Sequence, residues 1–165
     1  MARRTRRAGT PALRVLTEAS VAFTEHPYQH DPDHPSYGLE AAEALGVDPH
    51  VVFKTLLADV NGTLVVAVLP VTCSLNLKAL AATVGGKRAS LADPTEAERA
   101  TGYVVGGISP MGQRTALTTV VDDSALALGR MYVSGGRRGL DVALLPADLI
   151  RLTRAQTAPI CAQAR

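Results

Sequence analysis

Lys54 is an isolated charged residue in an apolar segment, and its ammonium group is suited to binding an anion. It lies in the run Val51–Leu57, with no other charged residue within four positions on either side. In an extended strand it would share a face with Val52 and Leu56. Two interpretations follow: a strand-edge lysine that discourages aggregation, or an ammonium in a cleft that pairs with phosphate or stabilises developing negative charge.

A glycine-rich segment, Gly102–Gly112, is the second candidate for chemistry. Closely spaced glycines let backbone N–H groups approach an oxyanion or a phosphate, although a plain turn explains the spacing equally well. A nucleophile elbow is excluded, because the second glycine of G-x-S-x-G is missing and Pro110 has no N–H to donate after Ser109. A further turn, Ser134–Gly139, carries two arginines. Neither segment matches a Walker A or dinucleotide-binding fingerprint.

Three histidines, His26, His30 and His34, recur every four residues, which on a helix would be a metal-ligand spacing. The prolines among them, at positions 27, 32 and 35, exclude that helix. We therefore expect solvated loop histidines, no metal site and no cofactor. No serine, histidine and acid arrangement stands out either, so hydrolytic chemistry would depend on the substrate and on backbone donors.

The charge of the chain is distributed unevenly along its length. The 165 residues carry a formal net charge of +2, of which four arginines in the first seven residues contribute +4. Residues 13–59 hold two basic and eight acidic groups, whereas residues 60–138 hold eight basic and five acidic groups. Local patches are sufficient to steer a polyanion, so a nucleic-acid partner is permitted, with the 60–138 segment facing its phosphates.

Cysteine usage and hydropathy indicate a cytoplasmic protein. Cys73 and Cys161 lie far apart and neither belongs to a C-x-x-C pair, which predicts reduced thiols. Polar residues between Arg14 and Ser20 interrupt any signal-like apolar run near the N-terminus. No apolar run approaches the roughly 18 residues needed to span a bilayer, so no membrane partner is expected.

Local signals predict helices and strands in mixed order within one domain, because no segment is long enough to act as a linker. The strongest is a hairpin around Asn61-Gly62. Asp93, Pro94 and Glu96 predict a helix with a capping box. The predicted helices span about 11–20, 39–45, 77–84, 94–102 and 146–153, and the predicted strands span 21–30, 51–60, 64–69, 87–91, 103–105, 118–121, 131–134 and 140–144.

Several ordered motifs resemble the YbaK/EbsC family, and within it the bacterial cysteinyl-tRNA(Pro) deacylases. They are Phe53-Lys54-Thr55-Leu56-Leu57, Ala92-Asp93-Pro94, Thr101-Gly102-Tyr103 through Gly112-Gln113, and Tyr132-Val133-Ser134-Gly135-Gly136 through Asp141. The resemblance extends from Thr10 to about Arg154. It implies an α/β (α+β) fold, a single compact domain with a mixed, curved, barrel-like sheet flanked by helices. The implied domain occupies residues 10–157, between a basic flexible tail at 1–9 and a C-terminal tail at 158–165.

The resemblance also implies an activity, trans-editing hydrolysis of mischarged cysteinyl-tRNA(Pro). The thiol of the substrate would attack its own ester, so no protein nucleophile is needed. The implied partner is the aminoacyl 3′ end of the tRNA, with a complex containing prolyl-tRNA synthetase left open. Two alternatives remain: a deacylase for alanyl- or other small aminoacyl-tRNA, and a non-catalytic module that binds tRNA or a synthetase.

The family's functional residues transfer by motif to positions of this chain. The implied catalytic groups are the Lys54 ammonium, which would hold the 3′-terminal adenosine or its phosphate, and the backbone of Gly106, Gly107 and Ile108, which would polarise the ester carbonyl. The implied substrate-binding residues are Tyr28, Phe53, Thr55, Ser109, Ser134 and Asp141.

Overall fold

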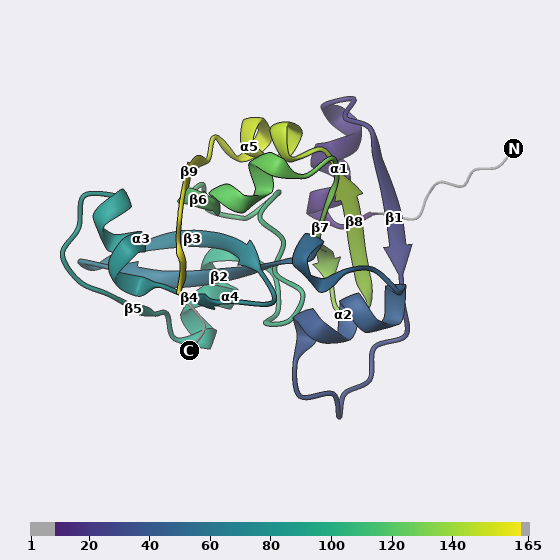
Figure 1. Cartoon of the computed structure of the whole chain (residues 1–165), viewed down its shortest axis with the longest axis horizontal. Helices are drawn as coiled ribbons and strands as arrows, with labels where there is room; N and C mark the ends of the chain where they lie inside the picture. Colours follow the sequence, from purple (N-terminus) through teal and green to yellow (C-terminus); the bar gives the residue numbers. More distant parts are fainter. Residues whose placement is uncertain (1–8, 163–165) are drawn as a thin grey trace, which may run out of the picture.

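A long hairpin forms the centre of the molecule (Figure 1). The computed structural model describes residues 9–162. Strands β2 (Phe53–Val60) and β3 (Thr63–Pro70) pair antiparallel, with Val60 opposite Thr63. Asn61 and Gly62 make the turn with φ angles of 52° and 89°, the left-handed conformation that a tight hairpin turn requires. The hairpin predicted from Asn61-Gly62 is confirmed.

Three sheets are built on and beside this hairpin. The largest is mixed, with the order β5-β2-β3-β6-β9, because β3, β6 and β9 are parallel whereas β5 and β2 are antiparallel neighbours. An antiparallel sheet has the order β1-β8-β7, and β10 pairs with β4. The remaining strands are β1 (Phe23–Pro27), β4 (Ser74–Leu75), β5 (Ala89–Leu91), β6 (Thr118–Asp122), β7 (Met131–Arg137), β8 (Leu140–Leu144), β9 (Gln156–Ala158) and β10 (Cys161–Ala162).

The predicted mixed α/β single domain is confirmed, with one qualification about the sheet. The sheets curve, as Figure 1 shows, but the strands of residues 9–162 remain in three separate sheets and close no barrel. An isolated parallel bridge between Val52 and Tyr132 connects the start of β2 to the antiparallel sheet. This junction brings the start of β2 close to β7.

The five predicted helices are present, although the first ends at Glu18, before the predicted Ser20, and the second begins at Tyr37, before the predicted Leu39. Thr10 Oγ1 accepts a hydrogen bond of 3.2 Å from the Leu13 N–H and so caps the first helix, and Gly46 ends the second at φ 69°. The helices are α1 (Pro11–Glu18), α2 (Tyr37–Leu45), α3 (Leu77–Thr83), α4 (Pro94–Thr101) and α5 (Pro146–Thr153), with 3-10 turns η1 (Pro49–Val51) and η2 (Asp123–Ala127).

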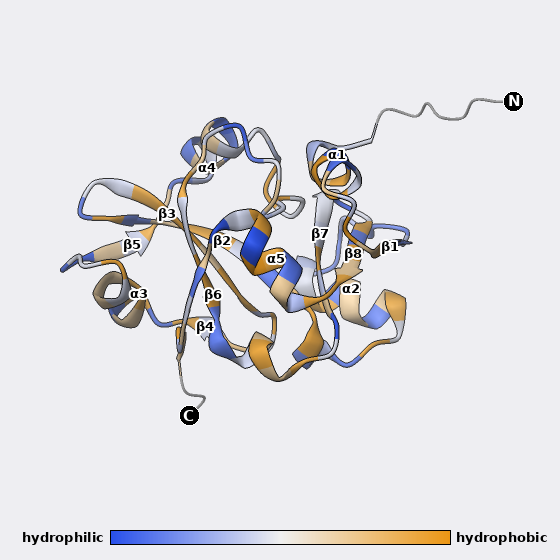
Figure 2. Ribbon diagram, turned by 90° about the horizontal axis from the view of Figure 1, so that it is seen from above, coloured by the Kyte–Doolittle hydropathy of each residue, from blue (hydrophilic) through white to orange (hydrophobic). Residues whose placement is uncertain are grey.

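The hairpin is buried on both faces, because alternate residues of β3 enter different cores. Val66 and Val68 pack toward Val133 of β7 and Leu16 of α1. Val65, Ala67 and Leu69 pack with Leu80 of α3 and with Ile160. Figure 2 shows the corresponding apolar colour along the hairpin strands. A hairpin held on both faces is a rigid support for side chains at its open end.

The segment 103–105, predicted as a strand, is instead a loop. Its polar groups are paired locally and not with a neighbouring strand: Tyr103 donates its hydroxyl hydrogen to the Met111 carbonyl at 2.7 Å, and the Val105 N–H donates to Glu98 Oε2 at 2.8 Å. The predicted capping box at α4 is also wrong, because the Asp93 side chain makes no cap hydrogen bond.

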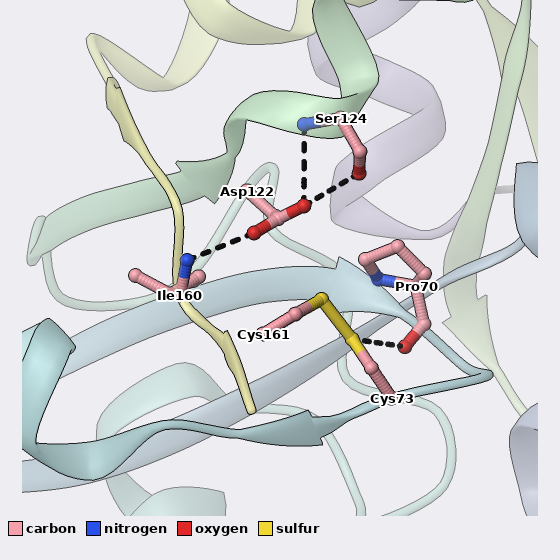
Figure 3. Close-up of a disulfide and its surroundings, with 6 residues drawn as sticks. All are labelled: Pro70, Cys73, Asp122, Ser124, Ile160 and Cys161. Atoms are coloured by element: carbon pink, nitrogen blue, oxygen red, sulfur yellow. Dashed lines mark hydrogen bonds between the residues drawn. A yellow bond between two sulfur atoms is a disulfide. The ribbon is translucent and has the colours of Figure 1, made fainter. Parts of the chain in front are cut away.

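The prediction of reduced cysteines is contradicted, because Cys73 and Cys161 form a disulfide with their Cα atoms 5.7 Å apart (Figure 3). The prediction was wrong because it considered only cysteines that are close in the sequence, whereas this disulfide joins residues 88 positions apart. Part of the segment expected as a C-terminal tail thus forms β10 against β4. Apart from Gly9, the predicted basic tail at 1–9 lies outside the described residues.

Within residues 9–162, no helix combines the length and the apolar character that crossing a membrane would require. Cytoplasmic localisation stays a prediction.

Candidate functional site

A pocket of about 490 Å³ opens at the junction of β2 with the antiparallel sheet. Its walls come from β2, from the start of α2, from α4, from the loop before Ser109, and from β7 and β8. The predicted site residues found in this lining are Tyr28, Phe53, Lys54, Thr55, Gly106, Ile108, Ser134 and Asp141. Residues from distant parts of the sequence therefore meet in one cavity.

Lys54 contributes the ammonium group of this pocket. On one edge of β2, Lys54 pairs with Leu69 of β3. On the opposite edge, β5 pairs with β2 only from Ala58 to Val60, so the edge beside Lys54 has no neighbouring strand among the described residues and borders the cavity. Lys54 is half-buried, and burial lowers the pKa of its ammonium. No carboxylate of the described residues forms an ion pair with it. A partly desolvated cation without a counter-ion favours an incoming anion or a developing negative charge.

Thr55 carries a buried hydroxyl that has no hydrogen-bond partner within the described part of the chain. An unsatisfied buried hydroxyl destabilises a fold by about 1–3 kcal/mol, so such a group marks a position where a bound molecule can supply the missing partner. Phe53, which precedes Lys54, is buried and gives the same pocket an apolar wall. Phe53 and Thr55 therefore lie on either side of Lys54 along β2, and all three residues line the pocket.

Asp141 provides a carboxyl group on β8, where it stands between His26 of β1 and Ser134 of β7. It is 5% exposed, and burial raises its pKa to about 7. Burial raises the pKa of the Tyr28 phenol to about 12, and the nearby charge of Asp141 adds to the increase. Ser134 Oγ accepts a hydrogen bond of 3.1 Å from the Gly136 N–H. Near neutral pH, this wall presents a carboxyl that can either donate or accept a hydrogen bond.

The raised pKa of Asp141 predicts a pH-dependent stability. The folded-state pKa of about 7 exceeds the unfolded value of 3.8, so the stabilising contribution is fully present below about pH 4 and is lost as pH rises through 7. Between pH 5 and pH 8, the wild type should lose on the order of 2 kcal/mol of unfolding free energy relative to Asp141→Asn. Urea denaturation of both proteins across this range measures the difference, and parallel pH profiles would contradict the assignment.

The glycine-rich loop divides into a part that lines the pocket and a part that packs. Gly106 and Ile108 line it, and neither N–H donates a hydrogen bond to any acceptor among residues 9–162. Gly107 is not among the lining residues. Its N–H donates to the Val104 carbonyl at 2.8 Å, and a Cβ at this position would lie 2.8 Å from the Arg137 backbone. Close packing against the Arg137 backbone explains why glycine occupies position 107, and the Gly107 N–H is already hydrogen-bonded within the loop.

Ser109 is likewise absent from the pocket lining. It is fully buried, and its Oγ accepts a hydrogen bond of 3.3 Å from the Met111 N–H. The Gln113 side-chain amide donates to the Ser109 carbonyl at 2.9 Å. The contacts of Ser109 hold the loop in shape behind the pocket, and the expectation that it touches the substrate finds no support in this position.

Tyr37 is a pocket residue that the sequence did not single out. It begins α2, and a Cβ on Gly106 would lie 2.7 Å from its ring, so ring and loop are in close contact. The Arg138 guanidinium stacks 5.1 Å from the same ring, and its Nε–H donates to the Val105 carbonyl at 2.8 Å. The sequence holds one signal near Tyr37, the helix cap at Ser36. A cap indicates where a helix begins, but it does not indicate that the first helical residue faces a pocket.

The three regularly spaced histidines do not converge. His30 Nδ1 hydrogen-bonds to Glu40 at 2.9 Å and His34 Nε2 to Glu43 at 3.1 Å, whereas His26 contacts Thr24. Throughout residues 9–162, no group of three or more potential ligands is arranged to hold a metal ion.

Comparison with known proteins agrees with this geometry. Residues 33–152 match the aminoacyl-tRNA editing domain family. EbsC of Enterococcus faecalis, named as a deacylase of Cys-tRNA(Pro) and Cys-tRNA(Cys), is 34% identical over 97% of this chain and 98% of its own. ProXp-y of Escherichia coli K12, named as a multifunctional Ser/Thr-tRNA deacylase, is 32% identical over 61% of this chain and 64% of its own. A crystal structure described as a trans-editing enzyme for prolyl-tRNA synthetase shares the fold, with a TM-score of 0.78, 24% identity, and coverage of 95% of this chain and all of the other.

Proposed function

Because this chain belongs to the aminoacyl-tRNA editing domain family, we propose that it is an aminoacyl-tRNA deacylase that removes cysteine from mischarged Cys-tRNA(Pro). The observation that carries the proposal is the 34% identity to EbsC over nearly the full length of both chains. The pocket supports it, because its lining includes Lys54, Gly106 and Ile108, and within residues 9–162 the Lys54 ammonium has no ion pair and the two N–H groups donate no hydrogen bond.

The chemistry proceeds without a nucleophile from the protein. The cysteinyl thiol attacks its own ester carbonyl, a C–S bond forms, and the bond from the carbonyl carbon to the ribose oxygen breaks. The thiol proton ends on that oxygen, which leaves tRNA with a free 3′ hydroxyl and a cyclic thiolactone that water then opens. The N–H groups of Gly106 and Ile108 stabilise the oxyanion, and Lys54 holds the terminal adenosine or its phosphate.

A pocket of this kind solves a selectivity problem that a synthetase cannot solve alone. Cysteine and proline are similar in size, so one binding site separates them by only about 1–3 kcal/mol, and a second site must remove the errors. In this chain the apolar wall at Phe53 and the Thr55 hydroxyl, which has no hydrogen-bond partner among residues 9–162, suit a short side chain with one polar atom. A cysteinyl thiol fits that description.

A second candidate substrate class is seryl- or threonyl-tRNA, which the similarity to ProXp-y favours. A hydroxyl is a stronger hydrogen-bond partner for Thr55 than a thiol, but it is a weaker nucleophile. An alanyl ester offers neither group, so the alanyl alternative would require water as the attacking species.

A deacylation panel decides among these substrates. Purified protein is incubated with cysteinyl-, seryl-, threonyl- and alanyl-tRNA, with and without prolyl-tRNA synthetase. We expect the fastest hydrolysis with Cys-tRNA(Pro), and the appearance of thiolactone before free cysteine. A faster reaction with seryl- or threonyl-tRNA would transfer the assignment to the second class. Binding without hydrolysis of any ester would show a non-catalytic tRNA-binding module, and acceleration by the synthetase would indicate that the two proteins act in one complex.

A further inference from the structure

A second hollow lies at the turn end of the central hairpin, and it is lined by positive charge. This groove, of about 830 Å³, is bordered by the hairpin turn, by the start of α3 and by the segment 87–90. Its cations are Lys78, Lys87 and Arg88, all exposed and none in an ion pair with a described residue. Its one carboxylate, on Asp59, already accepts a hydrogen bond of 2.7 Å from the Gly62 N–H.

Asn61 fixes the backbone that carries two of these cations. Its Oδ1 accepts hydrogen bonds from the N–H groups of Lys87, at 3.0 Å, and Arg88, at 2.9 Å, and its own N–H donates to the Arg88 carbonyl at 3.1 Å. Gly86 packs so closely that a Cβ would lie 2.4 Å from Val60 Cγ1. The basic pair therefore projects from a fixed backbone, and its charged ends remain free for a ligand.

Strand β5 connects this groove to the pocket that holds Lys54. Ala89 and Ser90 line the groove, whereas Leu91 and the following Ala92 line the pocket. Figure 1 shows β5 at the edge of the large sheet, beside α3. At about 3.3 Å per residue, Arg88 lies about 10 Å along the strand from Leu91. That length equals the axial rise of about three stacked nucleotides.

We propose that the Lys78, Lys87 and Arg88 groove binds backbone phosphates of the single-stranded 3′ end of tRNA, which runs along β5 and places its terminal aminoacyl ester in the pocket. The inference rests on the proposed deacylase function, because that function places a 3′ nucleotide at the far end of β5. A polyanionic strand suits three groove cations that form no ion pair with a described residue better than a single small anion does.

The test compares two variants that each remove two positive charges. Lys87→Gln with Arg88→Gln alters the groove, and Arg151→Gln with Arg154→Gln on and after α5 is the control, because neither of its residues lines either cavity. For each, kcat/KM is measured on Cys-tRNA(Pro) against salt concentration, and on cysteinyl-adenosine, which has the ester but no backbone phosphate.

The groove variant should lose at least about 10-fold in kcat/KM on the tRNA substrate, and its log–log salt slope should flatten by about 1.4, or 0.7 per lost contact to a single strand. Its rate on cysteinyl-adenosine should equal that of wild type, and the control should keep the wild-type rate and slope. Equal kcat/KM and slope for the groove variant and the control would overturn the groove assignment and leave the deacylase function intact.

Inactivity of the wild type on both substrates would instead overturn the proposed function. The groove is then tested alone, by fluorescence anisotropy with a labelled RNA hairpin that ends in a single-stranded CCA. A weaker Kd for the groove variant than for the control supports the groove, and equal Kd values reject it.

Discussion

Replacing Lys54 with alanine is expected to lower kcat/KM for deacylation of Cys-tRNA(Pro) by about 10²- to 10³-fold, the range found when one preorganised electrostatic group is removed from an active site. The reason is the position of the ammonium: half-buried in the pocket, with no carboxylate of the described residues to neutralise it. The measurement is the initial rate of ester hydrolysis at subsaturating tRNA.

Two further variants separate the charge of Lys54 from its shape. Lys54→Met keeps the alkyl stem and should be as inactive as Lys54→Ala, while its stability to urea should equal or exceed that of the wild type, because burying an unpaired ammonium is unfavourable. Lys54→Arg keeps the charge in a larger planar group and should restore only part of the rate. Wild-type deacylation by Lys54→Met would remove the ammonium from the mechanism.

Local signals were sufficient for most elements of this fold. The Asn61-Gly62 turn, the Thr10 cap and the limits of α5 all depend on neighbours within a few residues, and the structure has them where the sequence predicted them. The errors have more than one cause. The α4 capping box failed locally, because the Asp93 side chain makes no cap hydrogen bond, and the segment 103–105 is held as a loop by contacts seven or eight residues away. The return of Cys161 to Cys73 depends on a contact between distant residues that no local pattern encodes.

In the candidate site, too, the sequence predicted which residues matter better than it predicted where each of them lies. Motif resemblance selected Lys54 and Asp141, which the fold brings into one pocket. Adjacent glycines could not be distinguished by sequence, because Gly106 lines the pocket whereas Gly107 is small only to clear the Arg137 backbone. Asn61 was predicted as a turn residue, and its hydrogen bonds to the basic segment at 87–88 emerged only from the tertiary structure.

The disulfide carries the second large expected effect, on stability. Cys73 and Cys161 close a loop across a separation of 88 residues, and the loss of loop-closure entropy in the unfolded chain predicts a stabilisation of about 4–5 kcal/mol. Urea denaturation should therefore show a markedly lower midpoint for Cys161→Ala than for oxidised wild type. Reduced wild type should resemble the variant, and dithiothreitol should leave the variant unchanged. Equal midpoints for oxidised wild type and Cys161→Ala would contradict a stabilising bond.

Activity should respond very differently from stability, and this contrast tests whether the disulfide acts on the pocket. None of β4, β9 and β10 contributes a residue to the pocket lining, so the catalytic groups do not depend directly on the bond. The end of the chain has a second attachment, because Ile160 is fully buried and its N–H donates to Asp122 Oδ1 at 2.9 Å (Figure 3). Below its unfolding transition, Cys161→Ala should keep a deacylation rate close to that of oxidised wild type. A large loss of rate without unfolding would instead place the disulfide in control of the pocket.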